Sequence, residues 1–217
     1  MFVWSKLWGG LGLLVPLVAA CAAPVDPILI DLSGEREPST DLERAAVEIW
    51  MVGAFNAHCG GFLRSPALVI TAAHCIPEGH EEVLFRQLGS NALEPARVES
   101  IDRVPERDIA FLSPINEKNP CLESRSLHNG EHGTLLRPLW GTRISGKAEF
   151  VRFDDGITRS VLWGPGALGG DSGSPVVADD GRVIGIVSSG VWAAPGTPLT
   201  GVTLVPVFLP SEGLAPR

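Results

Sequence analysis

Short apolar runs separated by turn-forming residues fill the sequence from Ala46 onward, and they constrain its fold more than any other feature. Runs of this length, rich in Val, Ile and Leu, favour strands, because helices need ten or more residues of sustained apolar periodicity. The chain also holds 25 Gly and 18 Pro, the residues that turns require. The sequence therefore predicts an all-β protein of many short strands.

The candidate strands divide into two groups of six around a turn-rich stretch, residues 116–126. Asp154-Asp155-Gly156 and Asp179-Asp180-Gly181 are typical hairpin turns within the second group. Six antiparallel strands can close into a small barrel, which leaves no exposed sheet edge. We therefore predict two six-stranded antiparallel β-barrels, over residues 45–126 and 127–217. The candidate strands are 47–55, 59–64, 67–72, 82–89, 96–104, 108–112, 133–140, 147–153, 157–163, 174–178, 182–189 and 200–208.

The first 20 residues have the character of an export signal. Their apolar core, residues 7–18, is shorter than the roughly 20 apolar residues that a membrane-spanning helix needs. The junction Leu17-Val18-Ala19-Ala20-Cys21 resembles a bacterial lipobox, in which the cysteine becomes a lipidated N-terminus; the alternative is ordinary signal cleavage after Ala22. We expect residues 21–44 to be a tether and the chain to be exported to the bacterial cell envelope. We expect it to be anchored to the membrane through a lipidated Cys21. The alternative is a secreted or periplasmic protein without a lipid anchor.

Charge and composition exclude several classes of function. The 25 acidic and 17 basic residues give a formal net charge of −8, and no basic stripe with interleaved aromatic residues supports nucleic-acid binding. No group of His, Cys and carboxylate residues has the spacing of metal ligands. We therefore expect no metal, no cofactor and no nucleic-acid partner.

Three polar residues stand in local sequences that suit nucleophilic chemistry. Ser172 lies in the glycine-rich turn 169–175, His74 follows an apolar strand, and Asp108 opens the apolar run 109–112. A serine hydroxyl is a weak nucleophile until a base takes its proton, and a buried carboxylate must orient that base. Taken singly, each is a common turn or strand-end residue. Together they predict a catalytic set.

A second aspartate, Asp102, lies six residues before Asp108. Asp108 is the better candidate because the apolar run follows it directly, which predicts a strand that buries its first carboxylate. The remaining histidines lack a comparable apolar setting, so we interpret them as surface or loop residues.

The chain order His74, Asp108, Ser172 in these contexts resembles the trypsin-like serine proteases of the chymotrypsin fold. The resemblance implies an endopeptidase with polypeptide substrates and an active site in the cleft between two barrels. His74 would be the general base, Asp108 its orienting carboxylate and Ser172 the nucleophile that forms an acyl-enzyme. The backbone N–H groups of Gly170 and Ser172 would form the oxyanion hole.

The same resemblance implies where substrate binds. Ser188, Ser189 and Gly190 match the edge to which an extended peptide adds as a further strand. The alternative is that this segment is a barrel strand that binds no substrate. Gly166 stands at the base of the pocket for the P1 residue, which precedes the scissile bond. The base carries no aspartate, and Gly190 and Gly201 match its small walls. We therefore predict an apolar P1 residue, unless the loop that begins at Trp192 fills the pocket.

Three cysteines besides Cys21 remain to be placed. In the family, the pair that matches Cys59 and Cys75 is bridged, which implies a disulfide beside the catalytic histidine. Cys121 is left over. It is free if Cys21 is lipidated, and a Cys21–Cys121 bridge is the alternative.

Asp171, directly before the nucleophile, needs a partner because an unpaired buried charge is costly. In animal relatives the partner is a new N-terminus made by cleavage, for which this chain has no basic activation site. Bacterial relatives that are built active use an arginine on the first strand of the second barrel. Arg137 stands at that place, so we expect an Arg137–Asp171 ion pair. Arg143 is a rival, and a solvated strand arginine is the alternative.

Two other functions compete with an endopeptidase. A protease-fold binding protein at the cell surface that has lost catalysis would retain the fold, but such proteins usually lose part of the triad, which is intact here. An esterase of the α/β-hydrolase type is excluded. In that class the nucleophile lies in Gly-x-Ser-x-Gly and the catalytic residues follow the order Ser, Asp, His. Here Ser172 lies in Gly-Asp-Ser-Gly-Ser and the order is His, Asp, Ser.

Overall fold

The computed structural model describes residues 40–51, 57–104, 107–164, 166–192 and 200–207. The chain divides into two units, 1–34 and 35–217, and every described residue lies in the second. The predicted export signal, the lipobox cysteine Cys21 and most of the tether lie outside the described residues. Among the described residues, no helix is long and apolar enough to cross a membrane.

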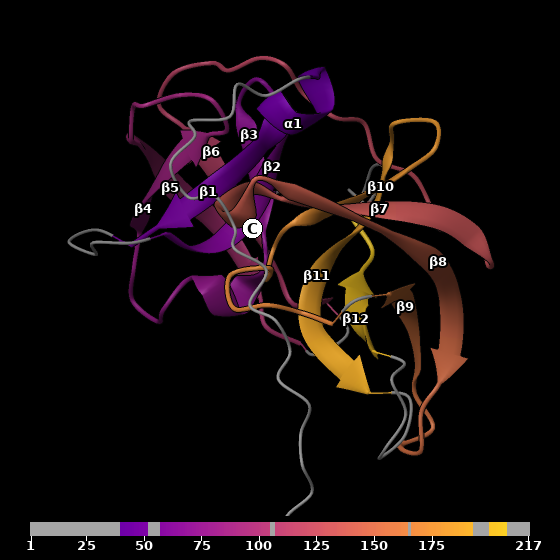
Figure 1. Cartoon of the computed structure of the whole chain (residues 1–217). Coiled ribbons are helices and arrows are strands. Elements are labelled where there is room, and N and C mark those ends of the chain that lie inside the picture. The colour runs from indigo at the N-terminus through magenta and orange to yellow at the C-terminus, as the bar shows by residue number, and fades with distance from the viewer. Residues whose placement is uncertain (1–39, 52–56, 105–106, 165, 193–199, 208–217) are drawn as a thin grey trace, which may run out of the picture. The chain divides into compact units, whose positions relative to one another are not determined.

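Twelve antiparallel strands form two closed barrels, as predicted (Figure 1). The order in the first barrel is β1-β2-β3-β6-β5-β4, and in the second it is β10-β11-β12-β9-β8-β7. The strands are β1 (Ala46–Trp50), β2 (Ala57–Ser65), β3 (Leu68–Thr71), β4 (Glu82–Gln87), β5 (Glu94–Asp102), β6 (Ile109–Pro114), β7 (Glu131–Arg137), β8 (Thr142–Arg152), β9 (Thr158–Gly164), β10 (Pro175–Ala178), β11 (Val183–Trp192) and β12 (Thr200–Val205).

Two Asp-Asp-Gly turns close hairpins of the second barrel. Gly156 and Gly181 have φ of 79° and 80°, a conformation that glycine adopts without steric cost. The Asp155 carboxylate accepts the Ile157 N–H at 2.8 Å, and Asp180 accepts the Arg182 N–H at 3.0 Å. Local turn chemistry therefore sets where β8 meets β9 and where β10 meets β11.

Each barrel has its own apolar core, and a third buried cluster joins the two barrels. Phe62 and Ile70 of the first barrel pack in this shared cluster with Val177 and Ile186 of the second, and all four are buried. Close packing of apolar side chains resists displacement. The shared cluster therefore holds the barrels in one arrangement, on which a site between them depends.

A short helix, α1 (Asp41–Ala45), stands where the sequence predicted the end of a tether. The Thr40 hydroxyl caps it by accepting the Glu43 N–H at 3.3 Å, and buried Glu43 pairs with Arg143 of β8 at 2.7 Å. Five residues are too few to produce a helical apolar pattern, so the sequence did not reveal this helix. Two further one-turn 3₁₀ helices are η1 (Ala73–Cys75) and η3 (Pro138–Trp140).

Candidate active site

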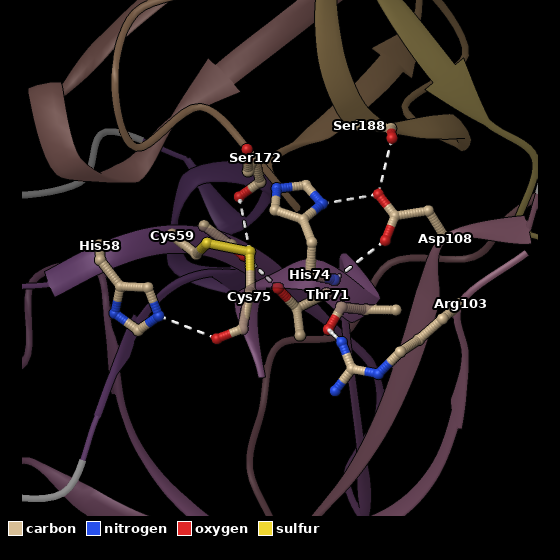
Figure 2. The surroundings of a disulfide bond; sticks show 11 residues. His58, Cys59, Thr71, His74, Cys75, Arg103, Asp108, Ser172 and Ser188 are labelled. Atoms are coloured by element: carbon tan, nitrogen blue, oxygen red, sulfur yellow. Dashed lines mark hydrogen bonds and ion pairs between the residues drawn. A yellow bond between two sulfur atoms is a disulfide. The ribbon is translucent and has the colours of Figure 1, made fainter. Parts of the chain in front are cut away.

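His74 lies in η1, directly after β3. The predicted disulfide is confirmed: Cys75 of η1 is bonded to Cys59 of β2, with 6.1 Å between the two Cα atoms (Figure 2). Cys121 carries a free thiol. The disulfide ties the turn that carries His74 to a core strand of the first barrel.

Asp108 holds His74 by its ring and by its backbone (Figure 2). The ring Nδ1 lies 2.7 Å from Asp108 Oδ2, and the His74 backbone N–H donates to Oδ1 at 2.9 Å. A third donor, the Ser188 hydroxyl, reaches Oδ2 at 2.6 Å from the second barrel. Three donors therefore converge on one carboxylate that is mostly buried.

The ionisation of Asp108 follows from these contacts. Burial raises the pKa of Asp108, but the hydrogen bonds from the His74 ring, the Ser188 hydroxyl and the His74 N–H lower it by more. The pKa consequently lies below its ordinary value. An ionised Asp108 keeps the proton of His74 on Nδ1, which leaves Nε2 as the nitrogen that can accept one.

Ser172 lies in a turn that is packed against the first barrel. Its carbonyl accepts the Gly60 N–H at 2.7 Å. The next residue, Gly173, has φ of 78°, and a β-carbon there would lie 2.3 Å from the Thr71 hydroxyl, so only glycine fits. No hydrogen bond joins Ser172 Oγ to His74 within the described part of the chain. Catalytic hydrogen bonds are often long without substrate and tighten when it binds.

The backbone around Ser172 presents two N–H groups without a protein acceptor. Asp171 donates its N–H to Leu168 O at 3.1 Å, whereas the N–H groups of Gly170 and Ser172 have no acceptor among the described residues. Gly170 has φ of 92°, and a β-carbon there would lie 2.6 Å from Leu139. Two such N–H groups, two residues apart in a tight turn, suit a developing oxyanion.

The structure pairs Asp171 with Arg137. The Arg137 guanidinium lies 2.8 Å from Asp171 Oδ2, and the two side chains are 5% and 1% exposed. Burial raises the pKa of Asp171, and the Leu168 N–H and the Arg137 charge offset only part of that rise. The rival Arg143 pairs with Glu43 instead. Arg137 also donates to Gly166 O at 2.8 Å, so one guanidinium connects the turn before Ser172 to the proposed P1 pocket.

Beside this turn, one edge of strand β11 has no partner strand among the described residues. Its neighbour β10 pairs with β11 only as far as Ile186, and the turn residues Gly173 and Ser174 bond to Val187. The pairing with β12 shifts between Val187 and Ser189, which leaves Ser188 outside the ladder. Within the described residues, the segment 188–190 is therefore open on the side that faces the cleft. The contact of Ser188 with Asp108 was not predicted, because nothing in its local sequence signals a partner 80 residues away.

The glycines predicted to border the P1 pocket lie at close backbone approaches. A β-carbon at Gly190 would lie 3.3 Å from the Ala167 β-carbon, and one at Gly166 would lie 3.3 Å from the Thr200 hydroxyl. At Gly201 it would lie 2.7 Å from Leu162 O. A side chain at Gly201 would collide with the backbone, and one at Gly166 or Gly190 would make a tight contact that its neighbour must yield to. The side chain of Trp192 lies outside the described residues.

Cys59, His74 and Cys75 bring one nitrogen and two sulfurs within 4.8 Å of one another. Both sulfurs are bonded to each other in the disulfide. Metals bind cysteine as the thiolate, which a disulfide sulfur does not provide. The group therefore does not fit a metal ion.

Comparison with known proteins identifies similar chains. The family model of the trypsin-like peptidase domain matches residues 59–186. A trypsin from Simulium vittatum is 28% identical over 185 residues, which cover 64% of this chain and 73% of that protein. The Rv3671c protease from M. tuberculosis in an inactive form has 25% identity and a TM-score of 0.54, covering 76% of this chain and 84% of that one. Its active form has 24% identity, a TM-score of 0.55 and coverage of 76% and 77%, which shows the fold alone.

We expect Asp108→Asn to lower the free energy of unfolding near neutral pH and to have less effect at about pH 3. The pKa of Asp108 in the folded protein lies below the unfolded value of about 3.9. Its ionised form therefore stabilises the fold above that value, and this stabilisation is lost as the pH falls through the folded pKa. Chemical denaturation at several pH values measures the difference.

The matched control is Asp102→Asn, which removes a more exposed carboxylate that contacts Arg107 at 3.2 Å. Exposed pairs contribute little, so this variant should unfold like the parent at every pH. An effect of Asp108→Asn that does not change between neutral and acid pH would contradict the assignment.

Proposed function

Because the chain belongs to the trypsin-like peptidase family, we propose that it is an active serine endopeptidase that uses Ser172, His74 and Asp108. The observation that carries this proposal is the Asp108 carboxylate, which lies within hydrogen-bond distance of both the ring and the backbone N–H of His74. The N–H groups of Gly170 and of Ser172 itself have no acceptor among the described residues. Together these groups supply a base, its orienting carboxylate and an anion site.

The proposed reaction forms and breaks one acyl-enzyme. The Ser172 oxygen attacks the peptide carbonyl carbon while His74 Nε2 takes the hydroxyl proton. The N–H groups of Gly170 and Ser172 stabilise the negative oxygen of the tetrahedral intermediate. When the C–N bond breaks, His74 donates its proton to the leaving amine. Water then attacks the ester by the same route and regenerates Ser172. Asp108 stays ionised throughout and stabilises the imidazolium.

Substrate residues N-terminal to the scissile bond would bind along the segment 188–190. No described strand pairs with that edge, so an extended peptide can add to it by backbone hydrogen bonds. The P1 side chain would enter the slot bordered by Gly166, Gly190 and Gly201. No carboxylate stands at Gly166, and no side chain extends from the three glycines that border the slot. We propose that P1 is apolar.

A second function has one specific observation in its favour. No hydrogen bond joins Ser172 to His74 among the described residues, and the chain is similar to both an inactive and an active form of one bacterial protease. A protease-fold binding protein that presents the same edge to polypeptides at the cell surface without cutting them is therefore the alternative. Covalent labelling separates the two functions.

A fluorophosphonate probe should label the protein at Ser172 and no other serine. The probe reacts only with a serine whose proton a base can take. Labelling should disappear in Ser172→Ala and persist in Ser174→Ala, which removes a buried hydroxyl two residues away. Mass spectrometry of the labelled peptide locates the adduct. A folded parent protein that takes no label would favour the binding protein.

We expect the variant Arg137→Ala, which leaves the nucleophile Ser172 unchanged, to lose most of its kcat. Without the guanidinium, Asp171 is a buried carboxylate with no cationic partner, and the turn that presents Gly170 relaxes. Disrupting an oxyanion hole lowers kcat by about 10²–10³. Arg143→Ala is the control, since Arg143 is the rival arginine and pairs with Glu43 of helix α1 rather than with Asp171. Normal kcat in Arg137→Ala would remove this account.

We also propose that the mature protein is anchored in the bacterial envelope through a lipidated Cys21. The support is the sequence Leu17-Val18-Ala19-Ala20-Cys21. Mass spectrometry of the mature N-terminal peptide should find a diacylglyceryl group on Cys21, and Cys21→Ser should release the protein from the membrane fraction. An unmodified N-terminus at Ala23 would indicate a secreted or periplasmic protein.

A further inference from the structure

A cavity of about 620 Å³ lies beside the proposed triad. His74, Asp108 and Ser188 line it, and so do residues of the second barrel as far as Phe153, at the start of the β8–β9 turn. Ser189, from the segment 188–190 of β11, also lines it. A peptide bound to that segment therefore passes over the cavity.

The charged groups that line the cavity are mostly basic. They comprise Arg103, Arg159 and one carboxylate, Asp108, which already accepts hydrogen bonds from His74 and Ser188. Arg159 contacts Asp155 at 2.6 Å. Arg103 has no carboxylate within ion-pair distance among the described residues. The cavity therefore presents a positive charge in a protein whose formal net charge is −8.

Arg103 is held in place by the turn that carries His74 (Figure 2). Its two terminal nitrogens donate to Ala73 O at 3.0 Å and to Ile76 O at 2.5 Å, the carbonyls on either side of His74 and Cys75. A guanidinium has five N–H donors, so these contacts leave several for a ligand. Because the side chain is already ordered, a carboxylate that binds it pays little further entropy.

Strand geometry determines which substrate side chains reach the cavity. Successive side chains of an extended peptide point to opposite faces. If P1 enters the slot at Gly166, then P3 points with it, and P2 and P4 point to the other face, toward His74 and the cavity. These two positions are the ones that a charge at Arg103 can select.

We propose that this cavity selects substrates with an acidic side chain at P2 or P4, and that Arg103 is the residue that recognises it. The proposal rests on the proposed function for the direction in which the peptide binds. Arg103 is exposed, so the preference for Glu over Gln should be about 3- to 10-fold in kcat/KM, the range of a partly solvated charged hydrogen bond.

Peptides that share one apolar P1 residue and carry Glu, Gln or Lys at P2, P3 or P4 test the proposal. The parent protein should prefer Glu at P2 or P4 and show no preference at P3. Added salt should reduce the preference. Arg103→Gln should abolish it, Arg103→Lys should keep most of it, and Arg103→Glu should reverse it in favour of Lys peptides.

The ratio between Glu and Gln peptides separates recognition from damage to the turn. Loss of the bonds to Ala73 and Ile76 would slow both peptides equally, whereas loss of recognition changes the ratio. Arg107→Gln is the matched control. Arg107 lies on the same loop and contacts Asp102, and it does not line the cavity. The ratio of kcat/KM between Glu and Gln peptides should therefore be the same for this variant as for the parent protein.

Binding to Ser172→Ala distinguishes failure of this proposal from failure of the proposed function. The Kd ratio of Glu and Gln peptides for that variant should match the kcat/KM ratio of the parent. A Glu preference in Kd with no cleavage by the parent would support the acidic subsite and overturn the endopeptidase. Cleavage or binding with equal preference for Glu and Gln at P2 and P4 would overturn the acidic subsite alone.

Discussion

The hydrogen bonds that hold one buried carboxylate, Asp108, come from both barrels. Its donors are the His74 ring and backbone from the first barrel and the Ser188 hydroxyl from the second. Burial alone would raise its pKa, and these donors reverse that effect. Ser188 can reach it only if the barrels are seated against each other, which the shared cluster around Phe62 and Ile186 secures. The hydrogen bonding of Asp108, which orients the proposed base His74, therefore depends on how the two barrels pack.

A second buried carboxylate shows the opposite balance. Asp171 accepts hydrogen bonds from the Leu168 N–H and from Arg137 on the same oxygen, and its other oxygen has no protein partner. Its pKa is accordingly raised by burial, whereas that of Asp108 is lowered. Arg137 is thus its only cationic partner among the described residues. The same guanidinium bonds Gly166 O, so one side chain supports both the turn before Ser172 and the segment proposed to bind P1.

Local charge near the site differs from the charge of the whole chain. The sequence is acidic overall, yet Arg103 and Arg159 line the cavity beside His74. Asp108 is hydrogen-bonded to His74 and Ser188, Asp102 pairs with Arg107, and Asp155 pairs with Arg159. Net charge describes solubility and long-range attraction, whereas recognition depends on which charges a cavity gathers.

The sequence by itself determined the twelve strands, their division into two barrels and the Asp-Asp-Gly turns, because strand and turn preferences act over a few neighbouring residues. The family resemblance added the Cys59–Cys75 disulfide and pointed to Arg137 beside Asp171. Only the tertiary structure decided that helix α1 docks through Glu43 and that Ser188 reaches Asp108. It also placed Arg103 against the turn of His74. These contacts join residues 27 to 100 positions apart, and they exist only after barrel closure brings distant segments together.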